Sequence, residues 1–245
     1  MSKRMILSVL LSLMGFTQCG RYRSFTMREI HDVREMLEEI NKKWPDAPLI
    51  EDDDPFEGTG DSLSGDERDI APRSMNKVIT KNGLRAMYWG FVVPFSKTPL
   101  LHAMSESVET KPTWREPLQT DRIIIATKGF YEYTHDAKKR PIDQYFFTDP
   151  NNDKLYLAGI SKVCAMPDGK EVECYAVITV PSNDSVSHVH DRMPLALDQS
   201  ELGDWLYNPL FIKTALSRVQ PHYNSVCTKK KSDGKKKADG QIGIF

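Results

Sequence analysis

The sequence predicts an α+β protein with a largely antiparallel, curved or barrel-like β core and a few flanking helices. Many short β-rich runs separated by turn residues lie between Ile70 and Val180, whereas helical spacing of apolar residues is confined to short stretches nearer the two ends. The runs do not form an internal repeat. The chain has 245 residues, of which 40% are hydrophobic and 27% charged, so it can form a substantial globular core.

The first element is a helix predicted over residues 27–43. Thr26 and Glu29 form a capping box that would satisfy the first free helix amides, and apolar residues then recur at helical spacing. Because the residue before a proline avoids the helical conformation, this helix should end before Pro45. Residues 45–69 follow as an acidic, flexible insertion, with ten acidic residues and one arginine for a net charge of −9.

Strands dominate the middle of the chain. The turn Lys81-Asn82-Gly83 predicts a hairpin between strands over 77–80 and 84–88, and Trp89 continues the second strand toward Pro94. Further β-rich runs predict strands over 122–127, 144–148, 155–161 and 173–180. Two short helices are expected over 202–206 and 212–219.

The chain is expected to consist of an apolar leader or propeptide over 1–18, one folded domain over 19–227, and a lysine-rich disordered tail over 228–245. The tail carries six lysines and two aspartates, a net charge of +4. Since the whole chain carries −1, the acidic insertion −9 and the tail +4, the remaining residues carry +4. A mildly basic body with a lysine-rich tail permits a polyanionic partner.

The leader has more than one interpretation. Lys3 and Arg4 before the apolar run Met5–Phe16 resemble a short signal peptide, and the run is too short to span a bilayer. However, Phe16-Thr17-Gln18 lacks the small residues of a cleavage site, and Gln18 is a poor neighbour for a lipoprotein cysteine. A removable propeptide and an unused upstream start codon are the other interpretations.

The four cysteines, Cys19, Cys164, Cys174 and Cys227, form no closely spaced pair, so neither a zinc site nor a disulfide scaffold is indicated. Cys164 and Cys174 would meet across a hairpin, where two buried thiols are preferred to a disulfide. His188 and His190 have the spacing of a metal-binding pair, but no third ligand is evident, and we expect no metal and no cofactor.

Cys19 is the residue with the most distinctive chemistry. If it were the first residue of the mature chain, its α-amine, with a pKa of about 7.7–8.0, would lie beside its thiol, with a pKa of about 8.5. An amine and a thiol so placed trap an aldehyde, because the amine forms an imine and the thiol then closes a five-membered thiazolidine ring. The alternative is an ordinary buried cysteine.

Two polar residues follow predicted strands. Glu132 lies among aromatic residues in Gly129-Phe130-Tyr131-Glu132-Tyr133, and partial desolvation would suit its carboxylate to proton transfer. His190 follows the strand over 173–180 and is a candidate acid–base group, with Asp191 or Arg192 positioning it or a phosphate. Taken alone, a glutamate beside aromatic residues is more often a surface residue than a catalytic one.

Four motifs occur in an order that resembles the SRAP family, the SOS-response-associated peptidases that act as abasic-site shields. They are Cys19-Gly20-Arg21-Tyr22; Ser105-Glu106-Ser107 with Lys111-Pro112 and Arg115; Gly129-Phe130-Tyr131-Glu132-Tyr133; and His190-Asp191-Arg192-Met193-Pro194. The resemblance extends from Cys19 to about Tyr223.

The resemblance implies a covalent, self-sacrificing link between Cys19 and abasic sites in single-stranded DNA, and a peptidase activity that frees the cysteine amine. It implies that Glu132 moves protons and that His190 helps to open the sugar ring. Arg21 and Arg192 would bind phosphates, and Trp89 would support a base or stack on it. Arg115 would also contact DNA.

This chain departs from the family pattern at two positions, where His102 and Met104 replace the usual asparagine and arginine. His102 can still donate a hydrogen bond, whereas Met104 cannot replace a cation. A monomer in the cytoplasm, associated with the nucleoid, is expected, with export or lipidation through the leader left open. Two other interpretations remain: a thiol peptidase with no role on DNA, and an exported, non-catalytic binding module.

Overall fold

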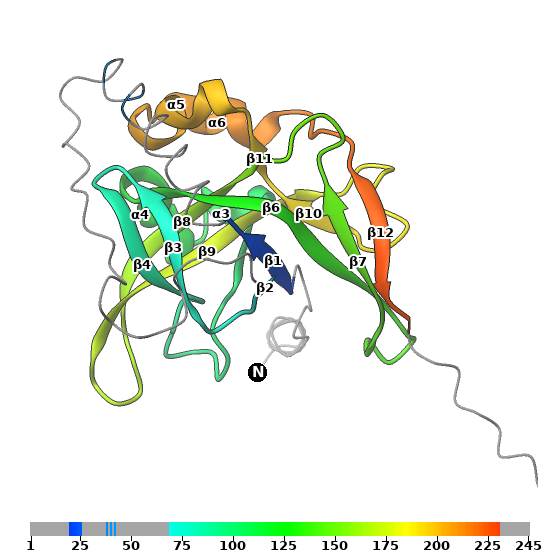
Figure 1. The fold of residues 1–245 in the computed structure, drawn as a ribbon. Helices are drawn as coiled ribbons and strands as arrows, with labels where there is room; N and C mark the ends of the chain where they lie inside the picture. Colours follow the sequence, from blue (N-terminus) through cyan, green and yellow to red (C-terminus); the bar gives the residue numbers. More distant parts are fainter. Residues whose placement is uncertain (1–19, 26–37, 39, 41, 43–68, 231–245) are drawn as a thin grey trace, which may run out of the picture.

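The computed structural model describes residues 20–25, 38, 40, 42 and 69–230. This part of the chain forms one twelve-stranded, mainly antiparallel sheet with short helices packed against it (Figure 1). The α+β class with a curved, barrel-like sheet is therefore confirmed. No helix among the described residues is long and apolar enough to cross a membrane.

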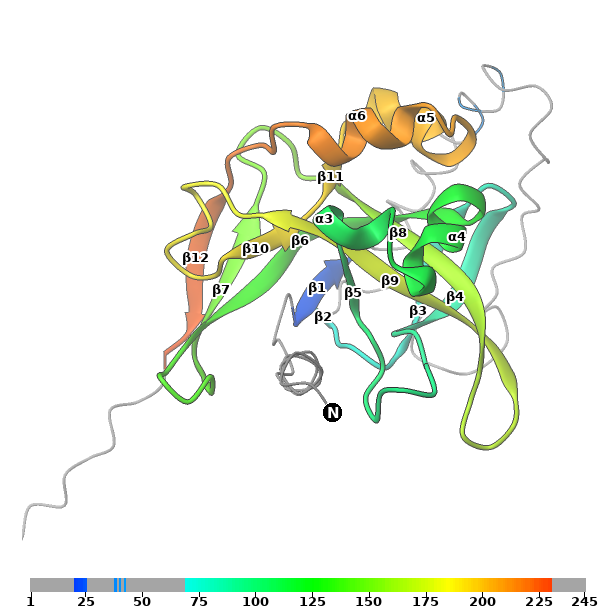
Figure 2. The same cartoon turned by 180° about the vertical axis from the view of Figure 1, so that it is seen from behind.

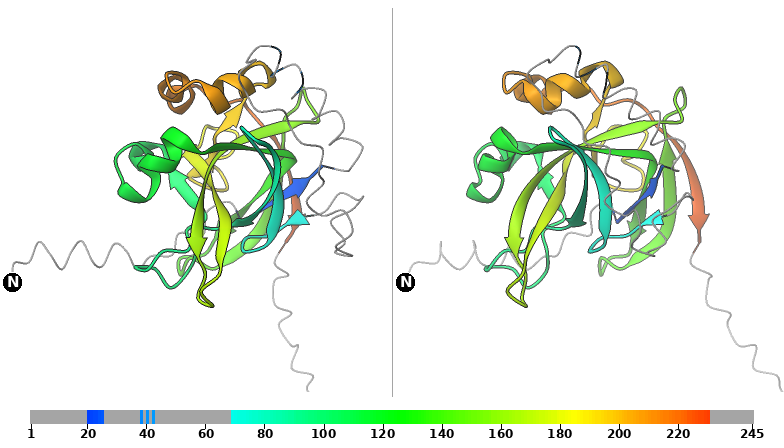
Figure 3. Two further views of the ribbon diagram at one scale, coloured as in Figure 1. Left: turned by 90° about the vertical axis from the view of Figure 1, so that its left-hand side faces the viewer. Right: turned by 60° about the vertical axis from the view of Figure 1, so that its left-hand side comes forward.

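Five strands close into a ring. They are β3 (Met75–Thr80), β4 (Gly83–Trp89), β6 (Arg122–His135), β8 (Leu155–Ala165) and β9 (Glu171–Pro181). Each is hydrogen-bonded to its neighbour in the order β8-β9-β4-β3-β6, and β6 returns to β8. Figure 3 shows this ring from its side. All of its pairs are antiparallel except β4 with β9. Closure pairs the strand edges with one another.

Large apolar side chains form the core around this ring, and Trp89, Phe91 and Tyr175 are fully buried. Helices α5 (Leu202–Tyr207) and α6 (Phe211–Ser217) cover one side, preceded by the short 3-10 helix Gln199–Glu201. Helices α3 (Ser105–Val108) and α4 (Pro112–Thr120) lie in front of the sheet in the reverse view of Figure 2.

The second half of β6 leaves the ring and forms an extension. There it pairs with β1 (Arg21–Ser24) on one side and β7 (Pro141–Thr148) on the other, and β7 pairs with β12 (Asn224–Lys229). β2 (Asp69–Ile70) pairs with β1. Two short strands pair with β9: β5 (His102–Met104) and β10 (Arg192–Pro194). β11 (Ala196–Leu197) pairs with β8.

β6 changes partners at a bulge around Lys128. Arg23 lies opposite Gly129 while Ser24 lies opposite Thr127, so the register between β1 and β6 skips one residue at Lys128. The Thr127 hydroxyl donates to the Arg23 carbonyl at 2.5 Å and accepts from the Gly129 N–H at 3.2 Å. A Cβ at Gly129 would lie 2.2 Å from the Phe147 carbonyl oxygen, so only glycine permits the chains to approach this closely.

Several expected elements are found, with longer bounds. The strand predicted over 122–127 continues to His135, so the motif around Glu132 lies within a strand and does not follow one. Of the helix predicted over 27–43, Glu38, Ile40 and Lys42 are described; all three are helical, and only Ile40 of them is buried. β12 reaches Lys229, two residues past the expected domain boundary. The leader, Cys19 and residues 45–68 lie outside the described residues.

Cys164 and Cys174 are confirmed as buried free thiols on the β8–β9 hairpin. A hydrogen bond from the Cys174 thiol lowers the pKa of Cys164 to about 7, and the pKa of Cys174 is raised in turn.

Candidate active site

The start of β1 lies beside the strand that carries Glu132. Arg21 is opposite Tyr131 in the antiparallel register, so Gly20 leads toward Glu132. A Cβ at Gly20 would lie 3.2 Å from Cε2 of Tyr133, which places this glycine against the aromatic ring. Cys19, the expected nucleophile, precedes Gly20 and is outside the described residues.

Glu132 is buried in β6, with 1% of its surface exposed. Its cross-strand neighbour on β7 is Tyr145, and the preceding pair on the same face is Phe130 with Phe147, whose stacked rings are 5.2 Å apart. Burial among aromatic side chains, inferred from the sequence, is therefore confirmed. A carboxylate in such surroundings is suited to exchanging protons with a reacting group.

His190 is held by the turn that connects β9 to β10. Its Nδ1 accepts the backbone N–H of Arg192 at 3.0 Å, and the Asp191 Oδ1 is 3.2 Å from the same nitrogen. Only 10% of the His190 side chain is exposed, against 86% of the Asp191 side chain. When Nδ1 accepts the amide, the imidazole is neutral and carries its proton on Nε2; when Nδ1 is protonated, it can donate to Asp191.

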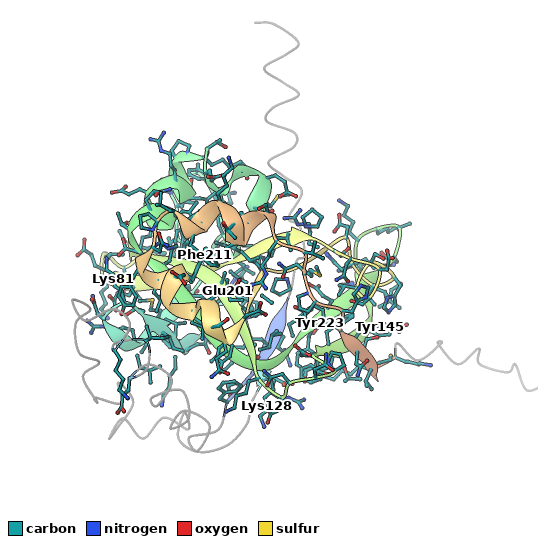
Figure 4. All side chains as sticks on the ribbon, turned by 90° about the horizontal axis from the view of Figure 1, so that it is seen from above. Lys81, Lys128, Tyr145, Glu201, Phe211 and Tyr223 are labelled. Carbon is teal, nitrogen blue, oxygen red and sulfur yellow. The ribbon has the colours of Figure 1, made fainter. Side chains whose placement is uncertain are left out.

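The loop that contains His190 packs against the strand that contains Glu132. The His188 ring contacts the rings of Tyr145 and Phe147, at centroid distances of 5.9 and 6.2 Å. The His190 ring contacts His135, at the end of β6, with centroids 5.9 Å apart. Glu132 and His190, 58 positions apart, therefore belong to one region beside β7, where Figure 4 labels Tyr145 near Tyr223.

Arg192 does not occupy the position expected for a phosphate ligand. It is buried, with 6% exposed, and its guanidinium forms a two-pronged ion pair with Glu106 of α3 and donates to the Thr179 carbonyl at 2.6 Å. These bonds lower the pKa of the Glu106 carboxyl. In this structure the guanidinium donors are engaged inside the protein, so the direct phosphate binding that the resemblance implies would require Arg192 to exchange these partners. Arg192 instead fixes the turn that holds His190.

Trp89 is also internal. It is fully buried, its ring is stacked on Tyr175 at 6.0 Å and lies 5.2 Å from Tyr22, and its Nε1 donates to the Leu101 carbonyl at 3.2 Å. Stacking on a base requires an accessible ring face, which Trp89 does not present in this structure, so of the two expected roles its burial favours the supporting one. The rings of Trp89 and the half-buried His102 meet edge to face, with centroids 6.0 Å apart, so Trp89 helps to position His102.

A cluster of charged and aromatic groups around Asp69, the Asp69 cluster, holds β1 against β2 and β6. The Asp69 carboxylate lies 3.3 Å from Arg23 and 3.9 Å from Arg21, and it accepts the Tyr131 hydroxyl at 2.9 Å. Arg23 also donates to the Tyr131 hydroxyl at 2.5 Å and lies over the Phe146 ring at 4.5 Å. Arg21, with 35% of its side chain exposed, remains within reach of solvent beside the start of β1.

Arg115 is exposed on α4, which packs on β8 and β6 at the end of the molecule away from β7 and β12 (Figure 2). The structure therefore does not bring it to the region of Glu132 and His190. Among the described residues, no three His, Cys, Asp or Glu side chains are grouped to hold a metal ion.

Sequence reasoning missed Asp69, His135 and the role of Glu106. Asp69 was counted only as the end of the acidic insertion, although its pairing with Arg23 depends on a contact 46 positions away. The position of His135, three residues after Glu132, was a usable signal for a second imidazole near the site.

The fold and the site define a class of protein: a small closed α+β barrel with a buried glutamate beside the start of β1 and a histidine fixed by a hydrogen bond in the loop that packs against β6 and β7. The family model for the SOS response associated peptidase (SRAP) matches residues 18–229, and the chain belongs to that family.

Curated relatives include abasic site processing protein YoqW of Bacillus subtilis, 29% identical over 135 residues, which span 53% of this chain and 59% of that protein. Another is abasic site processing protein HMCES of Xenopus tropicalis, 29% identical over 168 residues, which span 58% of this chain and 50% of that protein. The matches thus cover only half to three-fifths of these relatives.

Solved structures share the fold. A protein from Bacteroides thetaiotaomicron has a TM-score of 0.63 at 19% identity, covering 86% of this chain and 92% of that one. A phage-related protein from Bordetella bronchiseptica has a TM-score of 0.60 at 22% identity, covering 86% of this chain and 95% of that one.

Proposed function

We propose that this protein processes abasic sites by forming a covalent thiazolidine link between Cys19 and single-stranded DNA. The proposal is supported by the family, by relatives named abasic site processing proteins, and by the chemistry of an amino-terminal cysteine. The observation that carries it is the pairing of β1 with β6, because Gly20, the residue after Cys19, lies against Tyr133 next to the buried Glu132.

The reaction needs no external reagent. The Cys19 α-amine attacks the C1′ aldehyde of the opened sugar and forms an imine with loss of water. The Cys19 thiol then adds to the imine carbon, and its proton passes to the nitrogen, which closes the ring. Glu132 moves protons to and from the amine and the departing oxygen, and His190 exchanges a proton with the sugar as its ring opens.

The α-amine must be free for this chemistry, so the proposal requires that the mature chain begin at Cys19. We assign removal of the preceding residues to a self-cleavage that uses the same Cys19, Glu132 and His190. The active protein would be a monomer in the cytoplasm with the nucleoid, and the intact mass of protein from its native cell tests the mature amino terminus. A mass that retains the leader in crosslinking-competent protein would exclude the thiazolidine.

The Cys19→Ser variant tests the central step. On single-stranded DNA with one abasic site, wild-type protein should give a gel-shifted species that survives denaturation and heating without reductant. Cys19→Ser keeps an α-amine once the leader is removed but cannot close the sulfur ring, so it should give such a species only when borohydride traps the imine. Cys227→Ser, which changes a half-exposed thiol, is the matched control and should crosslink like wild type.

DNA with intact bases should give no crosslink with any of these proteins. Equal crosslinking by wild type and Cys19→Ser without borohydride would show that another residue is the nucleophile. Peptide cleavage without any crosslink would favour a thiol peptidase with no role on DNA.

A further inference from the structure

The turn between β6 and β7 carries three consecutive cations, all of them exposed. Its sequence is Asp136-Ala137-Lys138-Lys139-Arg140. The turn follows directly on His135, the last residue of β6, whose ring contacts that of His190. Four residues of extended strand separate the turn from Glu132, a length of about 13 Å. The basic turn is therefore next to the candidate active site.

The backbone of this turn is fixed by Asp136. The Asp136 carboxylate accepts the backbone N–H groups of Lys138 and Arg140, each at 2.9 Å, and it pairs with the Arg140 guanidinium at 2.7 Å. These bonds, of which the one from the Arg140 backbone is the strongest influence, lower the pKa of Asp136. Lys139 has a φ of 58° at the tip of the turn. The cations are thus presented on an ordered backbone, which lowers the entropic cost of binding a ligand.

The last strand brings two more exposed cations to the same end of the molecule. β12 runs antiparallel to β7, so Lys229 lies opposite Gln144 and Lys230 follows it toward the β6–β7 turn. Figures 1 and 2 both show the end of β12 beside this turn. We call the five cations the hairpin-end patch; they are Lys138, Lys139, Arg140, Lys229 and Lys230. Together with two acids of the same hairpin, Asp136 and Asp143, they give this end a net charge of +3.

We propose that the hairpin-end patch binds phosphates of the DNA that flanks the abasic site. The proposal rests on the proposed function, which puts the abasic sugar beside Glu132 and His190; a strand that leaves this region past His135 meets the patch. Lysine ammonium groups bind phosphates as point charges and do not read the bases, so the patch raises the affinity for a flank of any sequence. Each phosphate that it neutralises releases counterions, which makes this part of the binding dependent on salt.

The patch is tested by replacing Lys138, Lys229 and Lys230 together with glutamine. Its other two cations are kept, because the shape of the turn depends on them. A matched control removes the same charge from other parts of the surface by replacing three exposed cations with glutamine: Arg85, Lys170 and Lys213. The DNA probe carries a tetrahydrofuran in place of the abasic sugar. Because this ring has no aldehyde, binding is measured without crosslinking.

Fluorescence anisotropy at several salt concentrations compares a short probe with probes extended on one side or the other, by a single strand or by a duplex. Wild type and control should gain affinity from a flank on at least one side, and the patch variant should lose most of this gain. The slope of log affinity against log salt for the single-stranded flank should fall by about 0.7 for each phosphate contact, and so by up to about 2 for the three lysines. The arm that shows the gain identifies the flank as single-stranded or duplex.

An undiminished gain in the patch variant, or an equal loss in the control, would overturn the hairpin-end patch, because the effect would then be absent or would follow net charge alone. Crosslinking to a true abasic site separates this result from the proposed function. Patch-dependent binding of the flank without any crosslink would retain the patch and reject the Cys19 chemistry. Normal crosslinking without patch-dependent binding would do the reverse.

Discussion

At the scale of single residues, the site depends on a carboxylate that the fold keeps away from water. Glu132 has 1% of its surface exposed, and its neighbours across the strands are aromatic. Burying an ionisable carboxyl group costs free energy, and such groups are found mostly at functional sites. The position of Glu132 between the start of β1 and the His190 loop therefore favours a role in proton transfer.

Glu132→Gln should leave the fold intact, because the amide has nearly the same shape, and should slow the reaction by removing the base. We expect crosslink formation to be slower by about 10²–10⁴-fold, and release slower still. The measurement is a time course of the gel-shifted species, with circular dichroism to confirm folding. Glu173→Gln, an exposed change on β9, is the control and should match wild type. Unchanged rates in a folded Glu132→Gln protein would remove Glu132 from the mechanism.

At the scale of elements, one buried cation joins two helices to the barrel. Arg122, at the start of β6, has 4% of its surface exposed and donates to the carbonyls of Leu118 and Gln119 at the end of α4, and to those of Trp205 and Leu206 in α5. A cation at the carboxyl ends of helices satisfies free carbonyls and complements the helix dipoles. Burial lowers the pKa of Arg122, so the charged form of its guanidinium depends on the hydrogen bonds to these carbonyls.

Arg122→Met should reduce the free energy of unfolding by roughly 2–4 kcal/mol, because several buried carbonyls would lose their donors. Urea unfolding followed by tryptophan fluorescence measures the change. Arg85→Met removes an exposed arginine on β4 and should shift stability by no more than about 0.5 kcal/mol. The crosslinking rate per folded molecule should not change in either variant, since both lie outside the region of Glu132 and His190.

Element types were more predictable than their contacts. The strands around 77–88, 144–148, 155–161 and 173–180 follow from β-rich composition and turn residues, and all are present. The continuation of β6 past Thr127 was missed, because Lys128 and Gly129 read as the end of a strand; only contacts with β1 and β7 show that they form a bulge. The short strands β5, β10 and β11 were missed because two or three residues carry no periodic signal.

The residue types of the site could be predicted from the sequence, but which of these residues are buried could not. Glu132 and His190 were found from their motifs, and the fold brings them to one region. Trp89 and Arg192 were expected at a DNA surface but are internal, because a sequence motif does not distinguish a residue that touches a ligand from one that supports its neighbour.

At the scale of the whole molecule, the proposed partner is a polyanion, and binding should depend steeply on salt. Because β12 ends at Lys229, deleting residues 231–245 leaves β12 intact. This segment carries four lysines and two aspartates, a net charge of +2. Its deletion should weaken binding to single-stranded DNA and lower the slope of log affinity against log salt by about 0.7 for each lysine that contacts a phosphate.

Fluorescence anisotropy between 50 and 300 mM salt measures both quantities. Replacing the four lysines of this segment by glutamine, with the length unchanged, should reproduce the effect of the deletion. An unchanged affinity and slope in both variants would assign all phosphate contacts to the folded body.

Under the proposed function, the ion pairs of Asp69 would let the protein distinguish a polymeric anion from a small one. Arg21 and Arg23 already hold a resident anion, the Asp69 carboxylate, which is attached to the same chain and so is present at a high local concentration. A free phosphate or nucleotide arrives alone and must displace it at each encounter. A DNA strand held elsewhere by its other phosphates would present the next one at a comparable local concentration, so we expect only a multivalent ligand to exchange efficiently with Asp69.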